Sequence, residues 1–175
     1  MRFWEFFKNT LPSDKDQLSR LHDKIRRLFP TVDKDPEHEE EIVKIACLAG
    51  LLARVAYCDF HIAPSEKKQM KLALSKIGHI EEELIESITE LAISEIIDLA
   101  GLENHKYCYP LNSLMNNEQK YDLLLALFAI AASDGEVGHE ETEEIRLITA
   151  SLQLEHKYFI SARAQYKEKL SLLRA

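Results

Sequence analysis

The sequence is poor in helix-breaking residues and in long apolar runs. Glycine and proline each occur only five times in 175 residues, which leaves little material for the tight turns of a sheet protein. The longest apolar stretches, residues 45–53 and 123–132, are much shorter than the roughly 20 residues that a membrane-spanning helix requires. The sequence therefore predicts an all-α protein, a single multihelical domain around one core.

Positive charge is also scarce. The 22 Lys and Arg residues stand against 30 Asp and Glu, which gives a formal charge of -8. Because binding to phosphates needs clustered cations, we expect no nucleic-acid partner.

The three cysteines, Cys47, Cys58 and Cys108, are odd in number, and two of them lie in apolar runs. This usage favours a reduced, cytoplasmic compartment.

Aromatic side chains crowd the first eleven residues, and no secretory-signal pattern accompanies them. One interpretation is a helix that makes peripheral contact with the inner face of the membrane, with Arg2 and Lys8 toward the headgroups. The alternative is a hydrophobic arm that packs on its own core or on a second subunit. The apolar residues in question are Phe3, Trp4, Phe6 and Phe7. We assign residues 1–37 to this aromatic segment and a following helix.

The rest of the chain, residues 38–175, contains a repeated pattern. Residues 48–74 match residues 123–149 at a constant shift of 75 positions, and each copy reads as an apolar helix, an acidic turn and an amphipathic helix. The matched pairs include Leu48 with Leu123, Leu52 with Leu127, Ala56 with Ala131 and Leu72 with Leu147. This pattern predicts an internal pseudo-twofold duplication with halves at about 42–76 and 117–152.

Two helices are predicted to lie at the centre of the domain. Residues 42–57 and 121–133 are apolar on nearly every face, which is typical of a helix buried on all sides. Small residues such as Gly50 and Ala126 would let these two helices approach each other closely. Between the two copies, Pro110 and the asparagines at 112, 116 and 117 predict a linker.

The acidic turns share the spacing D-x-x-[IV]-x-x-x-E, which is the second half of an EF-hand calcium loop. The first half is missing. In the first copy the first and third ligand places fall on Val55 and Tyr57, and in the second copy on Ile130 and Ala132, none of which carries a carboxylate. A true EF-hand is therefore excluded.

Two interpretations of the turns remain. In the first, the carboxylates only cap helices: Pro64 suits the first position of a helix, and Glu66 would accept hydrogen bonds from the free N–H groups at its start. In the second, the duplication brings both turns together around a divalent cation such as calcium, magnesium or manganese. The candidate ligands are Asp59, Glu66, Asp134, Glu136 and Glu141. The second copy is the more acidic and the better candidate.

Catalytic motifs are absent from the sequence. It contains no G-x-S-x-G, no H-E-x-x-H and no phosphate-binding glycine loop. Cys58 lies three residues before His61, but a thiol at the end of a buried helix is expected to serve packing. We therefore expect a protein that is not an enzyme.

An apolar, alanine-rich helix followed by A-x-x-D-G-x-[IV]-x-x-x-E resembles the TerB-like family, named for a tellurite-resistance protein. The second copy matches at Ala131, Asp134, Gly135, Glu136, Val137 and Glu141; the first at Ala56, Asp59, Ile62, Pro64 and Glu66. The resemblance implies an all-helical domain with two central buried helices and a non-enzymatic interaction module of a stress response, with a protein partner. The alternative is a divalent-metal-binding protein that uses the duplicated turns.

Overall fold

The computed structural model describes residues 17–29, 36–97 and 104–170, and these fold into helices. Within these ranges, an isolated parallel bridge between Val137 and Leu170 is the one β-type pairing. The prediction of an all-α fold is confirmed. The α-helices are α2 Gln17–Arg26, α3 Pro36–Ala56, α4 Pro64–Gly78, α5 Glu82–Ile97, α6 Asn104–Leu114, α7 Asn117–Ala131, α8 His139–Ser151 and α9 His156–Ala164, and a 3-10 helix, η1, spans Lys167–Lys169.

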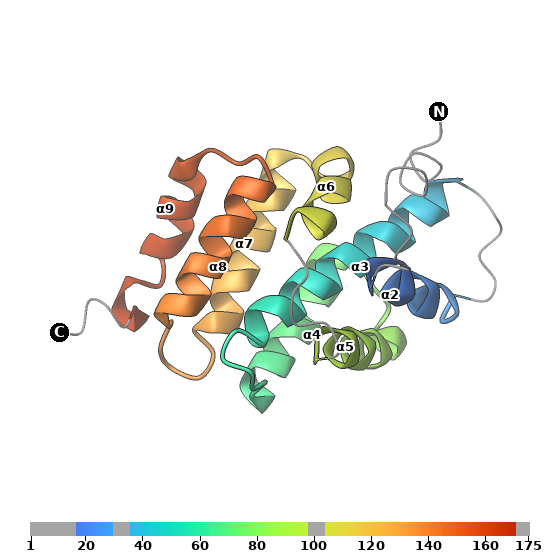
Figure 1. Cartoon of the computed structure of the whole chain (residues 1–175), viewed down its shortest axis with the longest axis horizontal. Coiled ribbons are helices and arrows are strands. Elements are labelled where there is room, and N and C mark those ends of the chain that lie inside the picture. Colours follow the sequence, from blue (N-terminus) through green and yellow to red (C-terminus); the bar gives the residue numbers. More distant parts are fainter. Residues whose placement is uncertain (1–16, 30–35, 98–103, 171–175) are drawn as a thin grey trace.

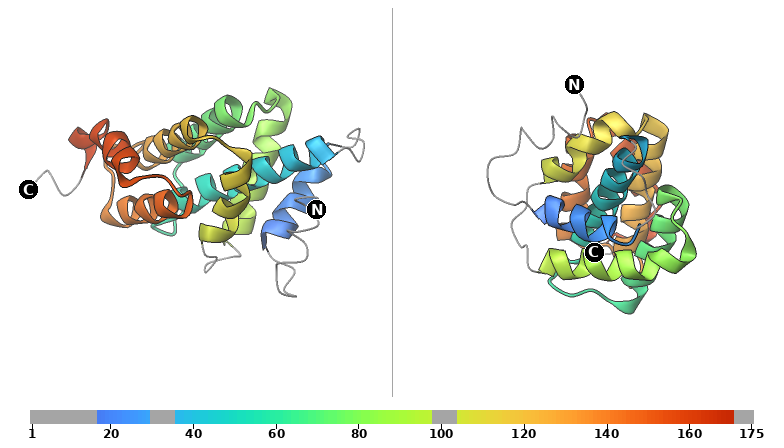
Figure 2. Two further views of the ribbon diagram at one scale, coloured as in Figure 1. Left: turned by 90° about the horizontal axis from the view of Figure 1, so that it is seen from above. Right: turned by 90° about the vertical axis from the view of Figure 1, so that its right-hand side faces the viewer.

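Helix α3 is the centre of the fold. It runs through the middle of the molecule, with α7, α8 and α9 at one end and α2 and α5 at the other (Figure 1). It contacts α2, α4, α5, α6, α7 and α8, and the view from above shows it running along the molecule between these helices (Figure 2). Most side chains of α3 from Ile42 onward are buried. In α7 the buried apolar side chains are Leu123, Leu124, Leu127, Phe128, Ile130 and Ala131. The prediction of two central buried helices is confirmed.

Gly50 has a different neighbour from the one expected. A Cβ atom at this position of α3 would lie 2.3 Å from Cε1 of Tyr107 in α6, and 2.7 Å from Cδ1 of the same ring. Any side chain here would therefore collide with an aromatic ring that is itself fully buried. The glycine admits the α6 tyrosine against α3, rather than serving the approach of the two central helices.

The linker predicted before the second copy is wrong, because residues 104–114 form α6. Pro110 lies inside this helix, where it removes one hydrogen bond at a typical cost of about 3 kcal/mol. The apolar side chains of Tyr107, Cys108 and Leu111 are buried in the core, and this burial offsets the lost bond. The asparagine signal at 116 marks a helix start, since Asn116 Oδ1 accepts the Gln119 N–H at 2.9 Å.

Helix α2 packs on the same core as the rest of the described chain. Leu21 and Ile25 are buried, and the buried Glu95 carboxylate of α5 accepts a hydrogen bond from Lys24 and lies 3.7 Å from Arg20. The proposed division of the chain at residues 37 and 38 stays a prediction. So does the pseudo-twofold duplication of the domain as a whole.

The aromatic segment with Phe3, Trp4, Phe6 and Phe7 lies outside the described residues, and the membrane interpretation of it stays a prediction. Among the helices that are described, none is long and apolar enough to cross a membrane.

Candidate functional site: two acidic turns

The two acidic turns follow the ends of the central helices. Turn one, residues 57–63, joins α3 to α4, and turn two, residues 132–138, joins α7 to α8. In turn one the Phe60 N–H donates to the Tyr57 carbonyl at 3.0 Å, and in turn two the Gly135 N–H donates to the Ala132 carbonyl at 3.2 Å. Each turn is thus closed by a hydrogen bond at the same relative position.

The aspartates hold the turns internally. Asp59 Oδ1 accepts the His61 N–H at 2.9 Å, and Asp134 Oδ1 accepts the Glu136 N–H at 3.2 Å. A short acidic side chain that binds the backbone two residues on is a standard means of stabilising a turn. Both aspartates are exposed, so each retains a carboxylate oxygen toward solvent.

The glutamates cap the helices that follow. Glu66 Oε2 accepts the Ala63 N–H at 2.7 Å, and Glu141 Oε2 accepts the Gly138 N–H at 2.7 Å. Neither alanine nor glycine has a side-chain acceptor, so only the returning half of a capping box is formed. Pro64 occupies the start of α4 as expected. The capping geometry proposed from the sequence is present in both turns.

The two turns lie side by side at one edge of the molecule (Figure 1). Ser133 Oγ, at the start of the bend after α7, lies 3.3 Å from Ser65 Oγ in the first turn of α4. Below this contact an ion pair between Arg54 and Glu144 joins α3 to α8. The acidic residues of the two copies therefore share one region, although they are separated by 75 positions in the chain.

The charges of the two turns act on one another. The pKa of Glu66 is raised to about 6, chiefly by burial, with the charges of Asp59 and Asp134 adding to the shift and the Ala63 hydrogen bond opposing it. Burial likewise raises the pKa of Glu141 to about 7, with Glu66, Asp134 and Asp59 adding to the shift and the Gly138 N–H opposing it. Four of the five predicted site residues thus form one electrostatic cluster.

The fifth predicted residue, Glu136, is exposed, and it is its backbone N–H that takes part in the turn. Within the described residues, no group of three or more His, Cys, Asp or Glu side chains is arranged to hold a metal ion. Glu66 and Glu141 each direct one oxygen to a backbone N–H. In this geometry the side chains cap and repel, and they do not converge as ligands.

Cys58 lies beside the cluster. Burial raises the pKa of its thiol to about 12, and the charges of Glu144 and Glu141 add to the shift. The thiol donates to the Arg54 carbonyl at 3.6 Å. A thiol with this pKa is protonated at neutral pH and is a poor nucleophile, which fits the packing role expected from the sequence.

Phe60 is the feature of the site that the sequence interpretation missed. Its side chain is 74% exposed, and its backbone has φ of 65°, in the left-handed region that disfavours bulky residues. Its ring meets the Tyr57 ring edge-on, with centroids 5.7 Å apart. Turn two has Gly135, with φ of 114°, at the matching position. The presence of an aromatic residue where the other copy has glycine was the sequence feature that could have identified this position.

Turn two is covered by the end of the described chain. The Val137 N–H donates to the Lys169 carbonyl at 2.7 Å, and Lys169 Nζ donates to the Ala132 carbonyl at 2.9 Å. Leu170 then pairs with Val137 in the isolated bridge, and both side chains are buried. No pattern in the sequence indicated this cover.

These features define a class of protein: an all-helical domain in which two acidic helix–turn–helix segments meet at one edge. The sequence profile described as tellurite resistance protein TerB matches residues 44–164. The chain belongs to the TerB family, as the acidic-turn motif indicated. No curated protein and no solved structure was found to match the chain.

Proposed function

We propose that this chain is a non-enzymatic interaction module of a stress-response system, and that the edge formed by turns one and two binds a positively charged group of a protein partner. The observation that supports the proposal is the shared cluster of Asp59, Glu66, Asp134 and Glu141. Within it, burial raises the pKa of two carboxyl groups, Glu66 and Glu141, and the negative charges of their neighbours add to the shift. A cationic partner would relieve this repulsion.

A non-enzymatic role agrees with the state of the described thiols. Burial raises the pKa of Cys58 and of Cys108 to about 12, and burial raises that of Cys47 as well. These thiols are held protonated, which suits packing rather than nucleophilic attack. The family description connects the proposal to resistance against tellurite, and a stress-response setting is proposed on that basis.

Affinity purification from cells grown with and without tellurite tests this function. The variant with Asp59→Asn and Asp134→Asn keeps oxygen acceptors for both turns but removes two charges of the cluster. A matched control carries Glu82→Gln and Glu83→Gln, two exposed residues at the start of α5. We expect the control to retain the partners of the natural chain and the aspartate variant to lose them. Equal recovery by both variants would contradict a partner at this edge.

A divalent cation is the second candidate for the positive group, and the same repulsion within the cluster favours it. The ligands would be drawn from Asp59, Glu66, Asp134, Glu136 and Glu141, with calcium, magnesium or manganese as the ion. Because the described side chains are not arranged as a metal group, binding would require the exposed aspartates to change rotamer. No step of the proposed function depends on such an ion.

Calorimetric titration of chelator-stripped protein separates the two candidates. Binding of calcium, magnesium or manganese would release or absorb heat and would raise the melting temperature. The Asp59→Asn and Asp134→Asn variant would lose both signals, whereas the α5 control would keep them. No heat and no shift in melting temperature at millimolar metal would eliminate the cation.

A further inference from the structure

We propose that turn one is the docking site for an extended segment of a partner protein in which a lysine directly precedes an aliphatic residue. This inference rests on the proposed interaction function and names the chemistry of the partner. It comes from a difference within the described residues, which cover turn two with the Lys169–Leu170 segment and place no such segment on turn one.

Turn two shows how such a segment binds. The Lys169 carbonyl accepts the Val137 N–H at 2.7 Å, while the ammonium group of the same lysine donates to the Ala132 carbonyl at 2.9 Å. The next residue, Leu170, pairs with Val137 and is only 3% exposed. One lysine and one leucine therefore satisfy a backbone donor, a backbone acceptor and an apolar side chain of the turn.

Turn one offers the same three groups. The Tyr57 carbonyl accepts the Phe60 N–H at 3.0 Å, as the Ala132 carbonyl accepts the Gly135 N–H. A carbonyl oxygen has two lone pairs. At Ala132 the second one accepts Lys169, whereas at Tyr57 no second donor is found among the described residues.

The donor and the apolar side chain fall on Ile62, which stands where turn two has Val137. In the described part of the chain its N–H has no hydrogen-bond acceptor. Its side chain is only partly buried against the core, whereas Val137 is 1% exposed. An aliphatic side chain placed as Leu170 is placed would complete the burial of Ile62, and its preceding carbonyl would accept the free N–H.

Phe60 adds a contact that turn two lacks. Its ring is the most exposed large apolar side chain of the described residues, and the left-handed backbone at this position holds it away from the core. Strained backbone that is retained at a surface position is a recognised mark of function. A ring in this place would pack against the aliphatic part of the bound segment.

Charge selects a basic segment. The carboxylates of Asp59 and Glu66 belong to turn one and the start of α4. Asp134 lies close enough to act on Glu66, and Glu66 in turn acts on Glu141. The ammonium group of an incoming lysine would enter this negative region.

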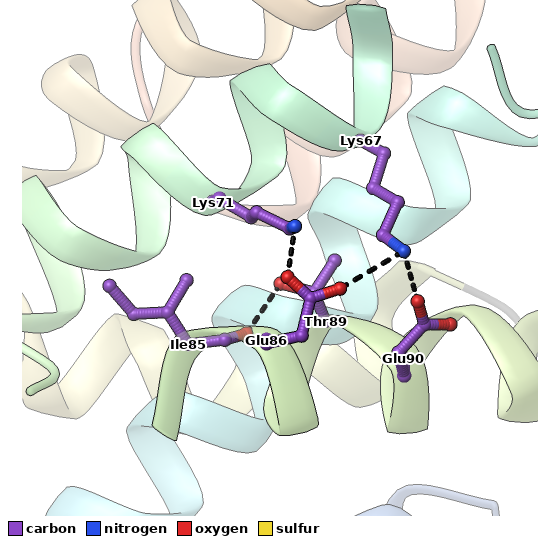
Figure 3. Close-up of polar contacts among 6 residues, drawn as sticks. All are labelled: Lys67, Lys71, Ile85, Glu86, Thr89 and Glu90. Atoms are coloured by element: carbon purple, nitrogen blue, oxygen red, sulfur yellow. Dashed lines mark hydrogen bonds and ion pairs between the residues drawn. The ribbon is translucent and has the colours of Figure 1, made fainter. Parts of the chain in front are cut away.

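Two lysines of α4 are paired with carboxylates of α5. Lys67 binds Glu86 and Glu90 of α5, and Lys71 binds Glu86 (Figure 3). Because these cations are paired along α5, they leave the negative charge at turn one in place for a partner.

The test is a titration of the full chain, labelled with ¹⁵N, with a capped synthetic peptide that has the sequence of residues 163–172. We expect the amide resonance of Ile62 to shift in a saturable way and its hydrogen exchange to slow. A control peptide with methionine in place of the lysine that corresponds to Lys169 should bind at least tenfold more weakly. The resonance of Val137 reports separately on any exchange at turn two.

Variants of the chain locate the contact. Phe60→Ala and Asp59→Asn should each weaken peptide binding several-fold, while Leu147→Ala, at a leucine of α8 that is 46% exposed, should leave it unchanged.

A shift at Val137 alone, no shift of Ile62 at millimolar peptide, or equal binding of both peptides would overturn the proposal. If partners are lost on mutation of the aspartates but the peptide does not bind, the interaction function stands and this partner chemistry is wrong. If the peptide binds turn one but partner recovery does not depend on the aspartates, the partner chemistry stands and the proposed interaction function is wrong.

Discussion

Turns one and two share their internal hydrogen bonds and differ in what surrounds them. In both, an aspartate binds the backbone two residues on, and a glutamate binds the backbone three residues before it. Turn two has glycine at the left-handed position and lies under the Lys169–Leu170 segment. Turn one has an exposed phenylalanine there and an unpaired N–H at Ile62 within the described chain. The local spacing of residues thus sets the backbone of a turn, while contacts distant in sequence decide whether the turn is covered.

The largest expected difference between the turns is the contribution of their apolar residues to stability. Val137→Ala should lower the free energy of unfolding by about 2–3 kcal/mol, because it leaves a cavity between the turn and Leu170. Ile62→Ala should cost only about 1 kcal/mol, since this side chain is half-buried and a smaller part of it leaves an apolar environment. Urea unfolding of the two variants measures the difference. Equal losses would mean that turn one is covered as well as turn two.

The next effect concerns the charge that the turns share. A group whose pKa is raised by folding stabilises the folded state below its unfolded pKa of about 4.5 and loses this contribution as the pH rises through its folded value, about 7 for Glu141. Glu141→Gln keeps an oxygen for the Gly138 N–H but carries no charge. We expect this variant to be more stable than the natural chain at pH 8, by about 1–2 kcal/mol after allowance for solvent screening, and nearly equal to it at pH 5.

Thermal unfolding of both proteins between pH 5 and pH 8 checks this prediction. Glu140→Gln, at the exposed residue before Glu141, is the control and should change the pH dependence much less. A Glu141→Gln variant that is less stable than the natural chain at pH 8 would show that the charged cap outweighs the cost of burying the charge beside other carboxylates.

A smaller effect is expected at the left-handed positions. Gly135→Ala should cost about 1 kcal/mol, and the cost would come from the backbone alone, since a Cβ atom there meets nothing within 4 Å. Phe60→Gly should be neutral or stabilising by about 0.5 kcal/mol, because glycine takes a positive φ without the strain that a Cβ atom brings, and the site is exposed. Urea unfolding checks both. A loss at Phe60→Gly as large as that at Gly135→Ala would mean that the Phe60 ring contributes to folding.

Much of the fold was predictable because periodic apolar patterns and caps are local signals. Helix α4 begins at Pro64, as the sequence indicated, and the burial of α3 and α7 follows from their apolar character on all faces. Helix α6 was not predicted, because a proline such as Pro110 locally indicates the end of a helix. The burial of Tyr107 beside Gly50 offsets the hydrogen bond that Pro110 removes, and this is a tertiary contact that no local pattern shows.

In the site, too, the local features were predictable and the tertiary contacts were not. The caps at Glu66 and Glu141 follow from spacing alone. The proximity of the two turns depends on how four helices pack, and the sequence offered it only as one of two interpretations. The cover over Val137 comes from residues more than 30 positions later in the chain, and no local pattern announces it. The exposure of Phe60 follows from a backbone conformation that propensities do not predict for an aromatic residue.

The central claim is that the carboxylates of the two turns form one charged cluster, and the titration of Glu66 and Glu141 tests it most directly. Side-chain carboxyl resonances of ¹³C-labelled protein, followed from pH 3 to pH 9, would give both midpoints. We predict a midpoint of about 6 for Glu66 and about 7 for Glu141, and Asp134→Asn should lower both. Midpoints near 4.5 for both glutamates, unchanged in the Asp134→Asn variant, would contradict the account and would leave two independent helix caps.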